Sequence, residues 1–363
     1  MDKKKYSFII ILVILMATFR TLINSSVSDD IIDSKFIKIA ATSPVLWNNT
    51  WGGSENENAE GIVLDSSGNA YITGKTASFG AAGSADVYLA EFNSNGGFER
   101  YFLWGGDAYE GGEAIALDSS GNVYVTGFTY SFEAEGSDIF LVKFHPIYGV
   151  EWYYTWGGSE DDVGIAITLD SLGNAYVAGL TSSFGEGNDD VCLVKFNPIG
   201  HVEWYYTWGG GGFDRGFAIT LDSSGNAYIT GETNSFGAGG YDIFLVKFNS
   251  TGGVEGNCTW GGIENEAGVS ISLDSSGKVY VAGRTESFGA GSKDMCLVKF
   301  NSIDGVEWNS TWGGLENDEG FALTLDSSKN AYVTGGTGSF GAGNDDLCLV
   351  KFNSIGGVEW NYI

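Results

Sequence analysis

Short runs of alternating large and small apolar residues recur from residue 45 to residue 363, and none of them follows the 3.6-residue period of a helix. Within one stretch, runs at 165–169, 175–178, 191–196 and 202–208 are separated by Gly, Asn, Asp, Ser or Pro. These lengths are typical of β-strands, and Asp and Gly between them supply Asx-type hydrogen bonds and positive φ angles. The pattern predicts four strands joined by three turns or loops.

The same stretch returns six times with a nearly constant period. Each copy begins with Trp-Gly-Gly, with a spacing of 53 residues once and 52 thereafter, at Trp51, Trp104, Trp156, Trp208, Trp260 and Trp312. A fixed period in this range indicates a repeat architecture, and four short strands per unit describe a propeller blade. A β-helix has a shorter period, and a lone 52-residue sheet buries too little core. The sequence therefore predicts an all-β propeller of six four-stranded repeats of about 52 residues.

Several motifs within the unit resemble a known family. Trp-Gly-Gly, an acidic loop, LDSSGNAYITG at 64–74 and DIFLVKF at 138–144 together resemble the SBBP (seven-bladed β-propeller) repeat and, more distantly, the NHL repeat. The resemblance covers residues 45–363. It implies extracellular or surface proteins of prokaryotes and implies no set of catalytic residues. One departure stands out, because the family name specifies seven blades and this chain has six units.

An additional strand complicates the count. VLWNNTW at 45–51 matches the fourth strand at 306–312, and VEWNYI at 358–363 is a fourth strand as well. One extra N-terminal strand is therefore expected beside the six units. We consider a six-bladed ring closed by this strand in the last blade, an open or incomplete seven-bladed arc, and a truncated gene model.

The N-terminus differs in composition from the repeats. Three Lys at 3–5 precede the apolar run FIIILVILMATF at 8–19, and small residues at 26 and 28 follow. This order is typical of a secretory signal peptide, and the run is short for a membrane-spanning helix. We expect a signal peptide or an uncleaved N-terminal anchor at 1–28, a linker at 29–44 and the propeller at 45–363. The expected location is extracellular or at the cell surface, with membrane contact only through this segment.

Charge limits the choice of partners. The chain has 18 Lys and Arg against 46 Asp and Glu, a net charge of −28. Binding to nucleic-acid phosphates needs a basic stripe, and no such stripe is visible, so no nucleic-acid partner is expected. With 43% hydrophobic residues the chain is also no disordered acidic tail. Proteins, glycans and cations are therefore the candidate ligands.

In every unit an acidic residue stands at the same distance after Trp-Gly-Gly. Six equivalent loops would place these carboxylates around one face, where oxygen ligands suit Ca²⁺ or another hard cation. The alternative is local turn chemistry, in which each carboxylate caps backbone N–H groups of its Gly-rich loop. The candidate cation ring consists of Glu57, Glu110, Asp162, Asp214, Glu266 and Asp318.

Catalytic signatures are hard to find. The two His residues stand at turns between strands, and three of the four Cys replace aromatic residues at one strand position, which indicates buried apolar packing. No P-loop or Gly-x-Ser-x-Gly motif occurs. We expect a secreted or surface-exposed binding scaffold for protein or glycan ligands, without catalysis. No cofactor is required by the sequence, and Ca²⁺ is the one candidate. The alternatives are a structural or adhesion component of a surface layer and, with less support, a lyase or hydrolase using the acidic loops.

Overall fold

The computed structural model describes residues 47–80 and 84–363 and contains six antiparallel sheets of four strands. In every sheet the strands lie side by side in chain order. The inner strands are β1 (Glu57–Leu64), β5 (Glu110–Leu117), β9 (Asp162–Leu169), β13 (Asp214–Leu221), β17 (Glu266–Leu273) and β21 (Asp318–Leu325). The second strands are β2 (Ala70–Thr76), β6 (Val123–Thr129), β10 (Ala175–Thr181), β14 (Ala227–Thr233), β18 (Val279–Thr285) and β22 (Ala331–Thr337). The third strands are β3 (Asp86–Phe92), β7 (Asp138–His145), β11 (Asp190–Phe196), β15 (Asp242–Phe248), β19 (Asp294–Phe300) and β23 (Asp346–Phe352). The outer strands are β4 (Phe98–Trp104), β8 (Gly149–Trp156), β12 (Val202–Trp208), β16 (Val254–Trp260), β20 (Val306–Trp312) and β24 (Val358–Tyr362).

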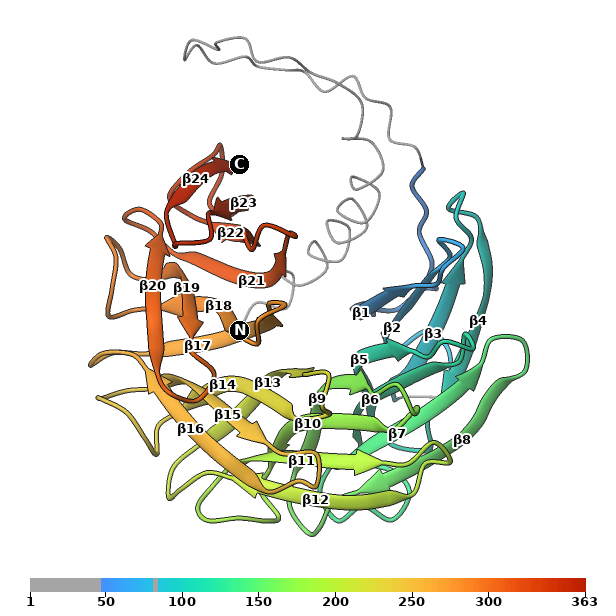
Figure 1. Cartoon of the computed structure of the whole chain (residues 1–363). Coiled ribbons are helices and arrows are strands. Elements are labelled where there is room, and N and C mark those ends of the chain that lie inside the picture. The colour runs from blue at the N-terminus through green and yellow to red at the C-terminus, as the bar shows by residue number, and fades with distance from the viewer. Residues whose placement is uncertain (1–46, 81–83) are drawn as a thin grey trace.

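The sheets stand around a common axis like blades, which confirms the propeller predicted from the repeats. We number them blades 1 to 6 in chain order. Their inner strands follow one another around the axis from β1 to β21 (Figure 1). No helix in the described residues could span a membrane.

The six blades form an open arc, because blades 1 and 6 stand apart (Figure 1). Blade 6 consists of its own four strands, so the N-terminal segment does not complete it, and the closed ring considered above is not formed. Instead, Trp51 packs on blade 1, with its ring 4.6 Å from Tyr88 and 5.2 Å from Phe79. The described part of this segment, residues 47–51, forms no sheet pairing. Residues 1–46, which include the expected signal and linker, lie outside the described residues.

The core is formed by apolar side chains from both faces of blades 2 to 5, which have a neighbouring blade on each side. Between blades 3 and 4, Tyr176 and Leu193 face Ile229 and Phe244 in one buried cluster. Neighbouring blades cover both sides of a sheet, and this explains why large residues alternate with small apolar residues rather than with polar ones. The four Cys are free thiols, and the three at the third-strand position are buried in such clusters, as expected.

A β-bulge interrupts the inner strand of every blade at the same place. In blade 3 the register passes from Gly164 to Ala166, so Ile165 has no partner on β10. The partner of Gly164 is Gly179, and a Cβ on Gly179 would lie 1.9 Å from the carbonyl oxygen of Val163. This close approach of two backbones explains why all six units have Gly at this position of the second strand.

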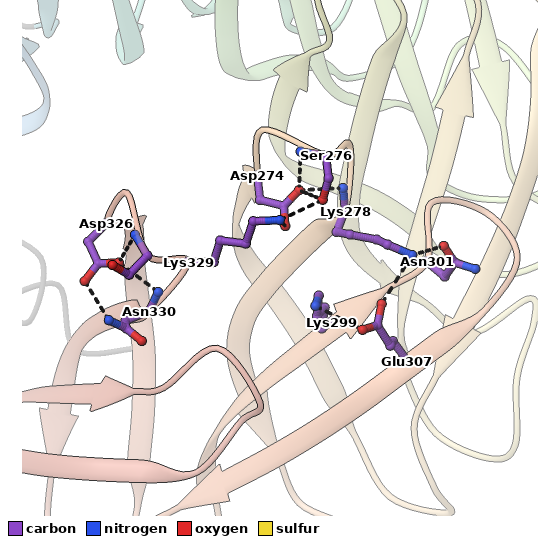
Figure 2. Close-up of polar contacts among 10 residues, drawn as sticks. Asp274, Ser276, Lys278, Lys299, Asn301, Glu307, Asp326, Lys329 and Asn330 are labelled. Carbon is purple, nitrogen blue, oxygen red and sulfur yellow. Dashed lines mark hydrogen bonds and ion pairs between the residues drawn. The ribbon is translucent and has the colours of Figure 1, made fainter.

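Asx turns join the inner and second strands. In blade 6, Asp326 accepts the N–H groups of Ser328 and Asn330 at 2.8 and 2.9 Å (Figure 2). Lys329 takes the position that Gly occupies in the other five units, with φ of 65°. Its Nζ reaches Asp274 of blade 5 at 3.1 Å, so this substitution adds a link between blades (Figure 2).

Candidate functional site

An acidic side chain opens the inner strand of every blade. Asp214, which is completely buried, accepts the Gly210 N–H at 2.8 Å, Ser235 Oγ at 2.6 Å and Thr233 Oγ1. The carboxylate thus ties the Trp-Gly-Gly loop to the loop after the second strand. In all six blades the second Gly of the triplet donates this N–H bond, at 2.7 to 3.1 Å.

These six acids are the residues of the candidate cation ring. Each stands in a different blade, and they are Glu57, Glu110, Asp162, Asp214, Glu266 and Asp318. Across residues 47–80 and 84–363, no three or more His, Cys, Asp or Glu side chains converge as metal ligands would. The hydrogen bonds to their own loops suit the turn-chemistry alternative, and cation binding at these residues stays a prediction.

In blades 2 to 6 a second acid approaches the carboxylate that opens the inner strand, and this second acid comes from the preceding blade. A Cβ on Gly157 would lie 2.1 Å from Asp138 Oδ1 of blade 2 and 2.8 Å from Asp162 Oδ2 of blade 3. Burial, together with the charge of Asp162, raises the pKa of Asp138 to about 6. Burial and the charge of Asp214 raise the pKa of Asp190 to about 6 in the same way.

These pairs predict that mild acid stabilises the protein. A carboxyl whose pKa is higher in the folded state binds its proton more tightly there, so its contribution is complete below about pH 4 and is lost as the pH rises through 6. We expect the free energy of unfolding to increase by about 1–3 kcal/mol from pH 7.5 to pH 5, allowing for partial solvent screening. Urea unfolding at several pH values measures this change.

The double variant Asp138→Asn, Asp190→Asn is the control for this pH dependence. Because Asn resembles the protonated carboxyl, its profile should be flatter between pH 5 and pH 7.5. Below pH 4 stability should fall in both proteins. Burial alone would raise the pKa of Asp274, but hydrogen bonds from Ser276, Lys278 and Lys329 lower it to about 2, and protonation breaks these contacts. A wild-type midpoint that decreases from pH 7.5 to pH 5 would contradict the prediction.

Comparison of the six units reveals positions that differ where their neighbours are constant. The end of the second strand reads Gly-x-Thr-x-Ser-Phe in every unit, and each x takes six different residue types. The first x is Lys75, Phe128, Leu180, Glu232, Arg284 and Gly336. The second x is Ala77, Tyr130, Ser182, Asn234, Glu286 and Gly338. Both positions flank a Thr that is constant in all six units.

Three further positions vary in the same region. One is the second residue of the inner strand, namely Asn58, Gly111, Val163, Arg215, Ala267 and Glu319. Another precedes the inner strand, namely Asn56, Tyr109, Asp161, Phe213, Asn265 and Asn317. The last precedes the third strand, namely Ala85, Ser137, Asp189, Tyr241, Lys293 and Asp345. We call these five positions together the variable rim.

Sheet pairing and blade stacking bring the rim positions together. Within blade 3 the variable residue Leu180 pairs with the variable residue Val163. Between blades, the Asp162 N–H donates to the Ser137 carbonyl at 2.6 Å, which places the third-strand entrance of one blade beside the inner strand of the next. The rim therefore surrounds the end of the axis at which the Trp-Gly-Gly loops lie.

A cavity of about 260 Å³ opens in the rim between blades 2 and 3. Every residue that lines it occupies a rim position. They are Phe128, Tyr130, Ser137, Asp161, Val163, Leu180, Ser182 and Asp189. Two aromatic rings, two aliphatic side chains, two serine hydroxyls and two carboxylates thus meet in one open hollow.

Polar contacts hold the two carboxylates in place. Asp161 Oδ1 accepts the Ser137 N–H at 2.9 Å, while the side chain stays exposed. Asp189 accepts Ser182 Oγ at 2.8 Å and forms an ion pair with Arg215 at 2.7 Å. Since Arg215 neutralises Asp189, Asp161 is the carboxylate of this cavity that is open to a ligand.

The rim and its cavity were not among the site residues predicted from sequence. The sequence does contain the information that identifies the rim, because an alignment of the six units separates the constant positions from the variable ones. The cavity itself depends on contacts between blades that no single unit contains.

Known proteins support the fold. Residues 155–185 and 209–237 match the model of the SBBP beta-propeller repeat, which confirms the resemblance seen in the motifs. The crystal structure of Sqt1 from Chaetomium thermophilum is similar, with a TM-score of 0.50 at 11% identity over 84% of this chain and 71% of that one. A protein of unknown function from Bacteroides caccae aligns with a TM-score of 0.45 at 14% identity, over 78% of this chain and 91% of that one.

One curated protein is similar in sequence over a shorter stretch. Regulatory protein FlaEY of Caulobacter vibrioides is 23% identical over an alignment of 115 residues that covers 28% of this chain and 12% of that protein. The chain therefore matches only a small part of this relative. The likeness to Sqt1 concerns the fold alone.

Proposed function

We propose that this chain, an all-β propeller with SBBP repeats, is a non-catalytic binding scaffold that holds a protein or glycan ligand at its variable rim. One observation carries the proposal. Six units keep the same framework residues and yet differ at five positions that lie together at one end of the axis. Eight of these residues, all from blades 2 and 3, line one cavity.

The proposed place of action is outside the cell or at its surface. The apolar run at 8–19 after three Lys supports export, and a large net negative charge keeps an exported protein dispersed. A lyase or hydrolase has less support. Glycoside hydrolysis typically uses two carboxyl groups, and Asp189, one of the two in the cavity, is held in an ion pair with Arg215.

Blade 6 supports a second candidate, a structural or adhesion component of a surface layer. Leu347 and Leu349 on β23 are only partly buried, whereas their equivalents Met295 and Leu297 in blade 5 are fully buried. An uncovered apolar sheet face favours self-association.

A thermal-shift screen with glycans, peptides and Ca²⁺ tests the proposal. A ligand at 100 times its Kd stabilises the native state by about 2.7 kcal/mol, so a hit raises the melting temperature. We expect a glycan or peptide to produce this shift in the wild type and not in Tyr130→Ala. Tyr148→Ala is the matched control, because Tyr148 is 81% exposed but lies in a turn at the other end of blade 2.

Other outcomes of the screen separate the alternatives. A shift with Ca²⁺ that disappears in Asp162→Asn would support the cation ring, and equal melting temperatures with Ca²⁺ and with a chelator would argue against it. Self-association in light scattering, without any ligand hit, would favour the structural role. If no ligand shift depends on Tyr130, the rim is not the binding surface.

A further inference from the structure

We propose that the cavity between blades 2 and 3 binds the side chain of a lysine or arginine from a polypeptide partner. This inference rests on the proposed function, because it names the ligand chemistry of the same rim. It follows from a comparison of this junction with the other junctions between blades.

Other junctions of the rim hold a cation of the protein itself. Between blades 3 and 4, the Arg215 guanidinium lies 5.0 Å from the centre of the Phe213 ring and pairs with Asp189 and Glu232 at 2.7 and 3.4 Å. Between blades 1 and 2, Lys75 Nζ lies 5.7 Å from the centre of the Tyr109 ring. Each combines a cation with an aromatic ring, an interaction that strengthens as water is excluded.

Between blades 5 and 6, the internal cations contact acidic side chains where the other two junctions have an aromatic ring. Lys293 Nζ lies 3.3 Å from Glu319 and 3.7 Å from Glu286. Arg284 approaches Glu319 at 3.8 Å. Internal cations thus stand at three junctions of the rim, and at two of these junctions they pair with rim carboxylates.

The junction between blades 2 and 3 lacks such a cation and is hollow. Val163, which lines the cavity, stands at the position that Arg215 occupies one blade later and carries no charge. No Lys or Arg lines the cavity. The receiving groups are nevertheless present, since Phe128 and Tyr130 supply two rings and Asp161 supplies an exposed carboxylate.

The shape and chemistry of the cavity fit one long basic side chain. Its 260 Å³ is several times the roughly 30 Å³ of a water molecule in the liquid, enough for a side chain but not for a folded element. The methylene groups of Lys or Arg would lie along Leu180, Val163 and the rings, while the charged head reaches Asp161. A ring pair in edge-to-face contact at 6.0 Å, formed by Phe128 and Tyr130, borders this path.

The charge of the whole molecule acts in the same direction. A chain of net charge −28 attracts a basic peptide over distances of about a Debye length, roughly 10 Å at 0.1 M salt. This attraction alone would be diffuse. Specific binding must therefore depend on side chains of the cavity, and variants can separate the two contributions.

The test measures fluorescence anisotropy of labelled, acetylated hexa-arginine and hexalysine with the full chain. We expect Asp161→Asn to weaken binding at least tenfold, because a charge-assisted hydrogen bond is lost. Val163→Arg should weaken it to a similar extent by supplying an internal cation, as Arg215 does in blade 4. Glu160→Gln is the matched control, since it removes the same charge from the neighbouring residue outside the cavity and should change the affinity less than twofold.

Unchanged affinity in Asp161→Asn and Val163→Arg, or no binding of either basic peptide, overturns the inference. A labelled neutral hexasaccharide distinguishes this failure from failure of the proposed function. Sugar binding that is lost in Tyr130→Ala but kept in Asp161→Asn would leave the rim as the binding surface and reject the basic side chain. Probes that bind all these variants as they bind the wild type would reject the rim itself. Melting temperatures of each variant show whether it is folded.

Discussion

Gly179→Ala should lower the free energy of unfolding by about 3–5 kcal/mol, a large effect for the addition of one methyl group. The new Cβ would lie 1.9 Å from the Val163 carbonyl oxygen and 3.0 Å from the Ile165 nitrogen. Both are backbone atoms of the bulged strand β9, which is fixed between β10 and the neighbouring blades. Relief of the clash requires the inner strand to move as a whole. Urea denaturation followed by tryptophan fluorescence measures the loss.

Gly211→Ala is the control for this variant. Gly211 follows Trp-Gly-Gly in the loop before blade 4, and a Cβ there would have no heavy atom within 4 Å. A surface substitution of this kind should change stability by less than about 0.5 kcal/mol. Equal losses in Gly179→Ala and Gly211→Ala would mean that the bulge does not explain the constant glycine.

Trp208→Ala should cost about 3–5 kcal/mol, because it removes a large ring from the contact between two blades. Trp208 ends β12 of blade 3 and is 8% exposed. Its ring packs on Phe244 at 4.7 Å and on Phe236 at 5.1 Å, both from blade 4. The cavity left behind cannot collapse easily between two rigid sheets. Calorimetric melting curves provide the measurement.

Trp360→Ala provides the comparison with the same residue type. Trp360 stands on the outer strand β24 of blade 6 and is 42% exposed. Its ring contact with Tyr332 has a longer centroid distance of 6.0 Å. We expect its loss to cost less than half of the Trp208 value. A larger cost for Trp360 would show that the outer strand of the last blade bears more of the stability than its exposure indicates.

Much of the blade could be predicted because each strand carries its own pattern. The strand expected at 202–208 has the observed bounds of β12, and the Asp170 turn lies where its Asx chemistry indicates. The inner strand was expected at 165–169, but β9 begins at Asp162. The bulge at Ile165 breaks the two-residue alternation, and Gly164 before it reads as a loop. Pairing with β10 of the same blade, which the local sequence of β9 does not contain, extends the strand through both.

The site was harder to predict for a related reason. An acid opens the inner strand in every unit, and this recurrence favours a shared cation site in the sequence. In the structure, the hydrogen bonds of such an acid lie within its own loops. The rim residues differ from unit to unit, so no motif marks them in a single unit. Only a comparison of the six units shows that they occupy equivalent positions. Even then, the hollow beside Val163 appears only when Ser137 of blade 2 is placed next to blade 3. Sequence can identify the variable positions, but only the stacking of blades shows which of them form a cavity.

The open arc also bears on how such a protein can change over evolutionary time. A closed ring must complete a full turn, so gaining or losing one unit alters the angle at every junction. An arc whose first and last blades stand apart has no such requirement, and duplication or deletion of a 52-residue unit changes only its span (Figure 1). The similarity of the six units is what duplications under this freedom would leave.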